Sequence, residues 1–541
     1  MKKYKPTTKE ELQNLVRDND IYLGDIDTSL ITDMSELFYK SNRKDFSGIN
    51  EWDTSNVTNM SAMFFNCKDF DQYLIFDTSN VVDMSYMFYG CKQFNQALNF
   101  NTSNVITMYG MFIDCINFNQ ALNFNTSKVT NMSYMFANCK NFNQPLDFDT
   151  SKAQNISYMF FACKNFNQQL NFDTSNIVNM RSLFSGCIKF NQVINFYTSN
   201  VIDMSFMFNN CKNFNQPLDF YTSNVIDMSC MLVGCKNFNQ PLDFDTSKVT
   251  NMSGMFGGCK KFNQALYFDT SKVTDISYMF FDCENFNKTL NFDTSNIANM
   301  SSLFSGCTKF NQVVNFNTTN VKDMSFMFNN CKKFNQPLNF DTSNVTNMFS
   351  MLAGCENFNQ LLNFDTSNVT NMNSLFNRCF QFNQPLNFNT EKVIDMGYMF
   401  SDCKNFNQPL DFDTSNTLSM RNMFRACKKF NQPLNFNTSN VTDMACMFYD
   451  CEDFNQALNF KTLKVKNMSS MFYNCKNFNQ ILKFTIYKVD SMINIFDGCK
   501  KLEQLPTFYT EYCKRNNNKE YSSIGIAQQV EIETEFLHFL K

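Results

Sequence analysis

The cysteines of this chain recur at a fixed interval, and that interval restricts the fold more than any other feature. Nineteen of the 22 cysteines lie 24 residues apart, from Cys67 and Cys91 to Cys475 and Cys499. A strict period of roughly 20 to 50 residues is typical of a solenoid, in which one small unit is stacked on itself. Because each unit contacts only its neighbours, all 541 residues can form one array rather than several domains.

Each copy of the repeat has apolar positions that hardly vary, and these positions predict the core. In the copy from Phe76 to Asn99 they are Phe76, Val81, Met84, Met87, Phe88, Cys91, Phe94 and Leu98. Neither strict alternation nor a period of about 3.6 residues runs through the whole set. The mixture indicates a coil of short segments joined by turns, and we count about twenty copies between Asp27 and Phe508.

Local patterns assign a structure to each part of this copy. Residues 94–100 alternate between apolar and polar side chains, which predicts a short strand. Residues 77–80 predict a turn, because Asp, Asn, Ser and Thr side chains bond to nearby backbone groups. Residues 81–84 are expected to form a second short strand. The apolar residues of 85–91 lie three or four apart, which predicts a single helical turn.

The two ends of a solenoid need covers, since an open end exposes unpaired backbone groups to other chains. Thr8 and Glu11 have the spacing of a capping box, which predicts a helix over residues 8–19. Near the other end, Phe536, Leu537, Phe539 and Leu540 are expected to close the last coil. We therefore predict three parts: an N-terminal capping helix in residues 1–26, the repeat solenoid in residues 27–508 and a C-terminal tail or cap in residues 509–541.

The periodic cysteines form a structural ladder, for which we weighed three interpretations. Its first members are Cys67, Cys91, Cys115, Cys139, Cys163, Cys187, Cys211 and Cys235. A buried Cys behaves as a small hydrophobic residue, and this is the role we expect. A redox or disulfide ladder is less favoured because no secretory signal is recognised, and a metal site because no CxxC cluster occurs. Cys230, Cys446 and Cys513 lie off the ladder and are the better candidates for reactive thiols.

Other polar repeats have simple structural explanations. Asn95 and Asn119 begin an asparagine ladder, which we expect to bond from coil to coil as amide ladders do in stacked strands. Asp147 and Asp149 resemble a calcium-binding pair, but Asn101 stands at the position of Asp149 in an earlier copy. A calcium-dependent repeat would keep its carboxylates, so we expect no metal and no cofactor.

Catalysis and several partner classes find no support in the composition. His538 is the single histidine, and no nucleophile–base set or phosphate loop stands out. The 46 basic and 50 acidic side chains nearly balance, which argues against a nucleic-acid or anionic-membrane surface. No apolar run of about eighteen residues predicts an integral membrane segment. By these patterns the protein is not an enzyme and is cytoplasmic.

One variable position in the repeat often carries an aromatic residue. Positions that change between copies are expected to face solvent, and exposed aromatics on a long surface suit a protein partner. The alternative is that these are solvated turn residues without a partner. The candidate binding residues are Tyr86, Tyr134, Tyr158, Phe206, Tyr278, Phe326 and Tyr398.

The string from Trp52 to Ser61, followed by Met63, Phe64 and Cys67, resembles the repeat of BspA-like leucine-rich-repeat surface proteins. It is also similar to the related repeat domain first noted in mycoplasma lipoproteins. The resemblance covers residues 5–510, although Phe replaces the usual Trp in every later copy. It implies a leucine-rich-repeat-like, right-handed solenoid with short β-strands and a short helical turn in each unit. It also implies a cell-surface protein that attaches to host proteins or surfaces.

Three functions are consistent with these observations. The first is a non-enzymatic repeat scaffold that binds protein partners, in the manner of an adhesin. The second is a structural spacer or coat protein that self-associates. The third is a thiol-rich protein that responds to redox conditions.

Overall fold

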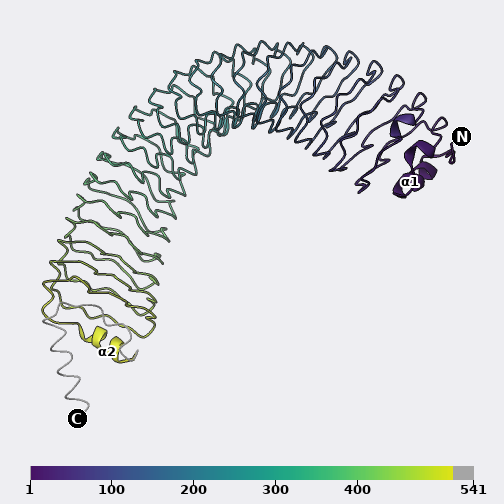
Figure 1. Ribbon diagram of the computed structural model, residues 1–541. Coiled ribbons are helices and arrows are strands. Elements are labelled where there is room, and N and C mark those ends of the chain that lie inside the picture. Colours follow the sequence, from purple (N-terminus) through teal and green to yellow (C-terminus); the bar gives the residue numbers. More distant parts are fainter. Residues whose placement is uncertain (1, 516–541) are drawn as a thin grey trace. The chain divides into compact units, whose positions relative to one another are not determined.

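The computed structural model describes residues 2–515, and these fall into two compact units that divide between Val273 and Thr274. Within each unit the chain winds into coils that stack side by side (Figure 1). Each unit is thus a repeat solenoid, as the period of the cysteines predicts. The predicted closing residues from Phe536 to Leu540, with His538 among them, lie outside the described residues.

Regular secondary structure is confined to short helices. The described residues contain α1 (Lys9–Arg17), η1 (Leu23–Asp25), η2 (Ile49–Glu51) and α2 (Thr507–Arg515). Everything between η2 and α2 consists of turns, isolated bridges and extended backbone. Interactions other than the hydrogen bonds of helices and long strands must therefore hold the backbone of each coil in place.

The predicted helical turn over residues 85–91 is wrong, because this segment forms successive β-turns. The N–H groups of Met87 and Cys91 donate to the carbonyl oxygens three residues earlier, at 3.3 and 3.0 Å. Tyr86 and Gly90 have φ angles of 57° and 71°, which a right-handed helix excludes. Apolar residues at helical spacing here reflect a chain of turns.

Alternate N–H groups of the same segment are used to join one coil to the next. Tyr86 and Phe88 donate their N–H groups to the carbonyl oxygens of Tyr109 and Met111, at 2.8 and 2.9 Å. Each of these acceptors lies 23 residues further along the chain. Because these amides are committed to the neighbouring coil, they cannot make the i→i−4 bonds of a helix.

The predicted strands are reduced to single bridges. Leu98 pairs in parallel with Leu122, and Asp83 with Thr107, but no longer strand is assigned within residues 2–515. The backbone ladder is interrupted because side chains take over part of the pairing. The carbonyl Oδ1 of Asn95, for example, accepts the backbone N–H of the residue 24 positions later at 2.9 Å.

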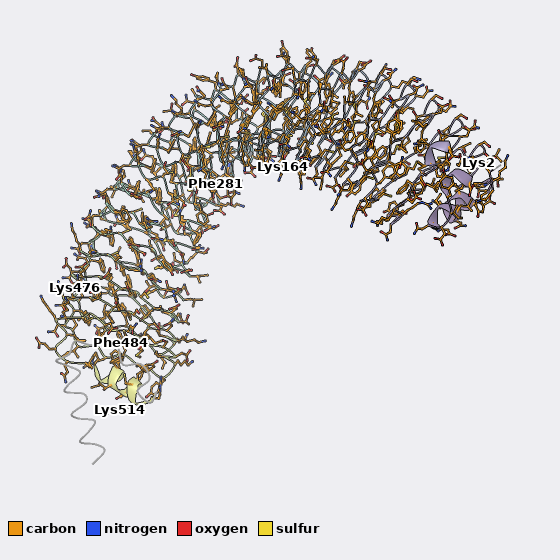
Figure 2. All side chains as sticks on the ribbon, in the orientation of Figure 1. Lys2, Lys164, Phe281, Lys476, Phe484 and Lys514 are labelled. Carbon is orange, nitrogen blue, oxygen red and sulfur yellow. The ribbon has the colours of Figure 1, made fainter. Side chains whose placement is uncertain are left out.

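All eight predicted core positions are buried in the copy that begins at Phe76. Phe88 and Phe94 stack within one coil, with ring centroids 4.4 Å apart. Phe88 also stacks on Phe112 of the next coil at 5.6 Å, and Phe94 stacks on Phe118 at 5.8 Å. Side chains line the coils of both units along their length (Figure 2). Each buried Phe contributes roughly 1.5–3 kcal/mol, so the stability of a coil depends on its neighbours.

Helix α1 confirms the helix predicted near the N-terminus. Thr8 is its N-cap, and its hydroxyl oxygen accepts the N–H of Glu11 at 3.2 Å. The Glu11 carboxylate accepts the N–H of Thr7 at 2.7 Å, one residue before the predicted partner. The helix buries Leu12 and Val16.

Helix α2 covers the last described coil and was not predicted. Its Tyr512 hydroxyl donates to the carbonyl oxygen of Asp490 at 3.2 Å and accepts the N–H of Met492 at 3.3 Å. Arg515 donates to the carbonyl oxygen of Val489 at 2.8 Å. These bonds occupy backbone groups that the next coil would otherwise have paired.

Candidate functional site

Two positions of every 24-residue copy adopt the left-handed backbone conformation, and they are filled very differently. We call them the Tyr86 position and the Gly90 position; each includes all residues a multiple of 24 away, from Ala62 and Asn66 onward. At the Gly90 position, sixteen of nineteen residues are Gly, Asn or Asp, the types that tolerate positive φ best. At the Tyr86 position only four of nineteen residues are Gly, Asn or Asp. Backbone preference therefore does not explain the Tyr86 position.

The seven candidate binding residues all lie at the Tyr86 position and all have positive φ. Their φ angles fall between 56° and 59°. Placing a non-glycine residue in this conformation costs about 1–2 kcal/mol. Strained residues of this kind persist where the surrounding structure or a function holds them. The residues concerned are Tyr86, Tyr134, Tyr158, Phe206, Tyr278, Phe326 and Tyr398.

The structure makes these rings less exposed than expected. Tyr278 is 50% exposed, whereas the other six are half-buried. Neighbouring aromatic side chains cover them. Tyr134 and Tyr158, for instance, stack with their centroids 4.4 Å apart.

In the first unit, four of the covering contacts join into a continuous row. Tyr86 meets Tyr109 edge to face at 4.9 Å, and Tyr109 meets Tyr134 at 5.7 Å. Tyr158 follows Tyr134 and contacts Phe161 at 5.9 Å. Tyr109 was not predicted, because most copies have a small polar residue at its position, such as Ser85 or Ser133.

The row extends toward the N-terminus through three further rings. Tyr86 lies 6.0 Å from Tyr89, Tyr89 stacks on Phe65 at 4.3 Å, and Phe65 stacks on Tyr39 at 4.7 Å. We call the whole set the aromatic band. It consists of Tyr39, Phe65, Tyr86, Tyr89, Tyr109, Tyr134, Tyr158 and Phe161.

An arginine terminates the aromatic band. The Nε–H of Arg181 donates to the Tyr158 hydroxyl at 2.9 Å, and its guanidinium carbon lies 5.0 Å from the ring centre of Phe206. Its charge is balanced by Asp203 at 3.8 Å. The hydrogen bond to Tyr158 raises the pKa of Arg181, and burial raises the pKa of Tyr86 and Tyr134. The hydroxyls of Tyr86 and Tyr134 are thus neutral at physiological pH.

The candidate residues of the second unit lie in smaller groups. Tyr278 contacts Phe281 at 6.1 Å, and Phe326 contacts Phe349 at 4.8 Å. Tyr398 interacts through a hydrogen bond with Arg421, whose pKa it raises. The structure therefore unites Tyr86, Tyr134 and Tyr158 in one surface, reaches Phe206 through Arg181, and leaves the other three apart.

The cysteine ladder lies inside the coils and has a second role that the sequence did not reveal. The Sγ–H of Cys91 donates to the carbonyl oxygen of Phe64, 27 residues earlier, at 3.1 Å. That same oxygen accepts the N–H of Cys67 at 3.0 Å. The ladder cysteines from Cys67 to Cys259 and from Cys307 to Cys499 are free thiols and are buried. Each is therefore a buried hydrogen-bond donor as well as a small hydrophobic residue.

Burial makes these thiols poor nucleophiles. It raises the pKa of Cys67 and of Cys499 to about 12, and it raises the pKa of interior members such as Cys139 well above the ordinary value for a thiol. A thiol reacts as its thiolate. Of the cysteines off the ladder, Cys446 is half-buried with a raised pKa, and Cys513 is buried in α2.

The polar repeats are occupied by structural hydrogen bonds. Along the asparagine ladder, the Oδ1 of Asn119 accepts the N–H of Asn143 at 2.8 Å, so the coil-to-coil bonding is confirmed. The donors are backbone N–H groups and, at some coils, Gln side chains such as Gln120, which donates to the Oδ1 of Asn95 at 3.2 Å. Asp149 accepts the N–H of Ser151 at 2.9 Å within its own turn. Within residues 2–515 no group of three or more His, Cys, Asp or Glu side chains is placed to hold a metal ion.

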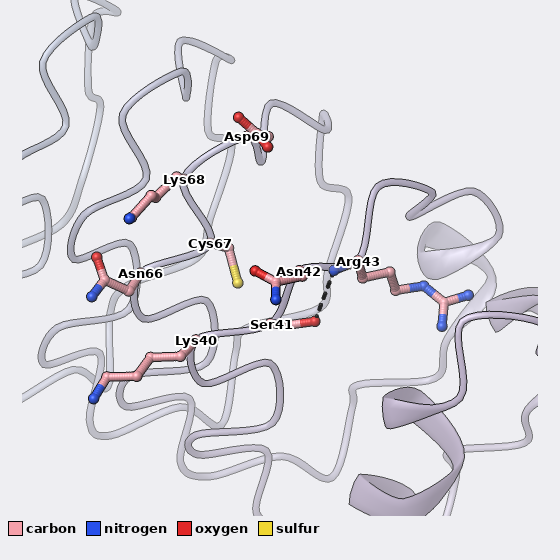
Figure 3. A pocket seen from close by; sticks show the side chains of 8 residues that line it. All are labelled: Lys40, Ser41, Asn42, Arg43, Asn66, Cys67, Lys68 and Asp69. Carbon is pink, nitrogen blue, oxygen red and sulfur yellow. Dashed lines mark hydrogen bonds between the residues drawn. The ribbon is translucent and has the colours of Figure 1, made fainter.

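One hollow of about 250 Å³ lies where the first, irregular copy meets the second (Figure 3). Lys40, Asn66 and Lys68 line it, and Cys67 lies on its inner wall. Arg43 points away from it toward α1 in Figure 3, and donates to the carbonyl oxygen of Asp18 at 3.0 Å.

The stacked coils and their surface aromatics define the molecule as a repeat solenoid. The chain belongs to the family described as "Mycoplasma protein of unknown function, DUF285", whose model matches it in seven overlapping stretches. These are residues 10–99, 74–171, 170–267, 243–338, 266–362, 338–414 and 410–509. No curated protein matches the chain.

Solved structures with some similarity include leucine-rich-repeat proteins. An internalin from Listeria monocytogenes shares 13% identity over 56% of this chain and 83% of its own, with a TM-score of 0.19. The plant peptide hormone receptor RGFR1, in complex with RGF2, shares 9% identity over 80% of each chain, with a TM-score of 0.19. TLR13, in complex with ssRNA13, shares 10% over 90% of this chain and 88% of its own, with a TM-score of 0.18.

The helices of the described residues are all short. None is both long and apolar enough to cross a membrane.

Proposed function

We propose that this protein is a non-enzymatic repeat scaffold that binds protein partners through the outer surface of its coils. The observation that carries the proposal is the aromatic content of the Tyr86 position. Seven Tyr or Phe residues stand there at positive φ, while the Gly90 position of the same coils follows the ordinary preference for Gly, Asn and Asp. A bulky aromatic residue at such a position is costly, and binding a partner would offset that cost.

We infer about twenty units of 24 residues each, an N-terminal cap in residues 1–26, the solenoid in residues 27–508 and a C-terminal cap or tail in residues 509–541. The similarity of the WDTSNVTNMS string to BspA-like proteins supports an adhesin-like attachment role at a cell surface. A rigid array of this kind presents many copies of one surface position to a partner, which favours multivalent binding.

Capture experiments with matched variants test this proposal. The full-length protein and a Tyr86→Ser/Tyr134→Ser/Tyr158→Ser variant are immobilised and exposed to host surface proteins, and bound proteins are identified by mass spectrometry. Serine occupies the same position in Ser182 and Ser302, so the variant is expected to fold. We expect specific partners on the wild-type protein that the variant loses.

The matched control removes aromatic residues elsewhere on the surface. Tyr197 and Tyr221 are 53% and 64% exposed, and other copies have Asp or Asn at their position, such as Asp173 and Asn101. A Tyr197→Asn/Tyr221→Asn variant should retain the partners. If both variants bind alike, or if no protein binds the wild type, the proposed function is wrong.

A further inference from the structure

We propose that the aromatic band binds a partner segment rich in arginine, with lysine as a weaker substitute. This inference rests on the proposed function and specifies the chemistry of the partner. The basis is the contact that the chain's own arginines make with aromatic rings at equivalent positions in other coils.

Arginines lie against aromatic rings at four points of the repeat, one of them Arg378 at 6.0 Å from the ring centre of Phe380. Arg181 bonds to the Tyr158 hydroxyl and lies over the Phe206 ring. Arg425 lies 5.3 Å from the ring centre of Tyr449. At the fourth point Arg421 forms a hydrogen bond with a tyrosine of the preceding coil. A ring face attracts cations through its quadrupole, and the planar guanidinium both stacks and donates hydrogen bonds.

Cations of the chain lie at both ends of the aromatic band, with Lys40 4.9 Å from the ring centre of Tyr39 and Arg181 bonded to Tyr158, and the positions between these ends supply none. Between Ser61 and Ala162, the four positions that correspond to residues 85, 86, 89 and 90 include no Lys or Arg. Asp114 is the one charged residue among them, and Asp83 lies half-buried in the same coil as Tyr86 and Tyr89. This part of the surface therefore combines electron-rich rings with negative charge, which is complementary to a basic segment.

The contacts of Arg181 show what such a segment would gain. Tyr158 offers its hydroxyl oxygen as acceptor at 2.9 Å, while the Phe206 ring lies 5.0 Å from the guanidinium. Tyr86, Tyr109 and Tyr134 carry a hydroxyl and a ring on neighbouring coils. Hydrogen bonds join Tyr86 to Tyr109 and Tyr134 to Tyr158, and a tyrosine oxygen in such a bond still has a lone pair that can accept from an arginine. Because inter-coil backbone hydrogen bonds fix these rings in register, little ordering is needed when the partner binds.

A defined peptide series tests the proposal with the full-length protein. The probes are twelve-residue peptides of the repeat Arg-Gly-Ser, with the arginines kept, replaced by lysine, or replaced by citrulline, which has the shape of arginine without its charge. Affinity is measured by isothermal titration calorimetry at physiological salt. We expect the arginine peptide to bind, the lysine peptide to bind several-fold more weakly, and the citrulline peptide not to bind.

Two variants locate the binding. Tyr86→Gly/Tyr134→Gly/Tyr158→Gly should weaken arginine-peptide binding at least tenfold, and glycine is already accepted at this position in Gly110 and Gly254. Ser157→Arg places an arginine where Arg181 stands in the next coil, so it should occupy the band and also weaken peptide binding. Tyr197→Asn/Tyr221→Asn should bind as the wild type does. Circular dichroism checks that each variant is folded, and the corresponding serine triple variant replaces the glycine variant if it is not.

Several results would overturn this inference. Equal binding of the citrulline peptide would show that charge is not recognised, and unchanged binding by the glycine variant would place the peptide elsewhere. Self-association in sedimentation that the glycine variant abolishes would assign the band to a second copy of this chain. If the arginine peptide fails while the capture experiment still shows band-dependent partners, only the arginine inference fails and the proposed function stands.

Discussion

At the scale of single residues, the repeat contains two kinds of side chain. Some suit the backbone conformation or complete its hydrogen bonds, whereas others stand in a strained backbone conformation that they do not favour. The Gly90 position follows the conformational preference of the turn, whereas the Tyr86 position does so in few copies. The buried Cys91 thiol belongs to the first kind, because its S–H occupies the second lone pair of the Phe64 carbonyl. Side chains of both kinds lie within six residues of one another in the same coil.

We expect truncation of a Tyr86-position residue to change stability much less than truncation of a core residue. Tyr134→Gly should change the free energy of unfolding by no more than about 1 kcal/mol, because relief of the left-handed backbone offsets the lost ring contacts. Phe136→Ala, two residues further on in the core, should cost about 3–5 kcal/mol. Urea unfolding followed by circular dichroism measures both. A loss at Tyr134 as large as that at Phe136 would make the ring a core element instead of a surface one.

A ladder cysteine should matter through its hydrogen bond as well as its volume. Cys163 Sγ–H donates to the carbonyl oxygen of Phe136 at 2.9 Å in a fully buried site. Cys163→Ala removes both the donor and the packing of the sulfur, so we expect a loss of about 1–2 kcal/mol in the free energy of unfolding. Cys446→Ala, at a half-buried position off the ladder, is the matched control and should cost less. Equal losses would contradict a special role for the ladder.

At the scale of elements, the sequence predicted which residues are buried better than it predicted the backbone that buries them. Apolar residues at 84, 87, 88 and 91 have helical spacing, yet the amides of this segment alternate between turns and the next coil. The sequence of one copy does not show bonds to a residue 23 positions away, so a purely local pattern favours the helix. Helix α2 was missed for a similar reason, since Phe508 continues the phase of the repeat.

The same limit applies to the candidate surface. Variation between copies pointed to the Tyr86 position, and the structure joins three of its rings through Tyr109. Tyr109 itself lies at a position that is mostly Ser in other copies, so no repeated pattern marked it. Contacts between neighbouring coils, rather than the composition of one position, assemble the band.

Helix α1 gives a prediction at this scale. Thr8→Ala removes the side-chain acceptor for the N–H of Glu11 and should lower the free energy of unfolding of the N-terminal coils by about 1 kcal/mol. Hydrogen exchange, read separately for the first coils and for the interior of the first unit, measures this. Thr7→Ala keeps the Thr8 cap and serves as control. Faster exchange throughout the unit would mean that the helix stabilises more than its adjoining coils.

At the scale of the whole molecule, the fold depends on keeping every coil in register with the next. A deletion of residues 210–233 removes one period and joins Asn209 to Gly234, which occupy successive positions of the repeat. This variant should fold with a thermal midpoint close to that of the parent, because every remaining interface has an identical type of partner. A deletion of twelve residues, 210–221, should prevent ordered stacking. Circular dichroism and size-exclusion chromatography distinguish the two, and equal folding of both would disprove the 24-residue unit.

The buried thiols also predict how the molecule as a whole responds to alkaline pH. Burial raises the pKa of Cys67 and Cys499 from 9.0 to about 12, and interior members such as Cys307 are raised well above 9.0. Above pH 9 the unfolded chain loses thiol protons that the folded chain keeps, so the unfolded state binds fewer protons and the free energy of unfolding falls. Each affected thiol contributes up to about 1.4 kcal/mol per pH unit.

Because the ladder repeats this effect in successive coils, we expect stability to be level between about pH 6 and 9, where the carboxyls are ionised in both states, and to fall steeply between pH 9 and 12. Urea midpoints at a series of pH values measure the fall, and a thiol reagent should label the ladder only as the protein unfolds. High salt is the control, because it screens repulsion between surface charges but leaves buried thiols unaffected. A fall that high salt abolishes would assign the alkaline transition to surface charge, whereas a fall that persists, accompanied by thiol labelling, would assign it to the cysteines buried in the coils.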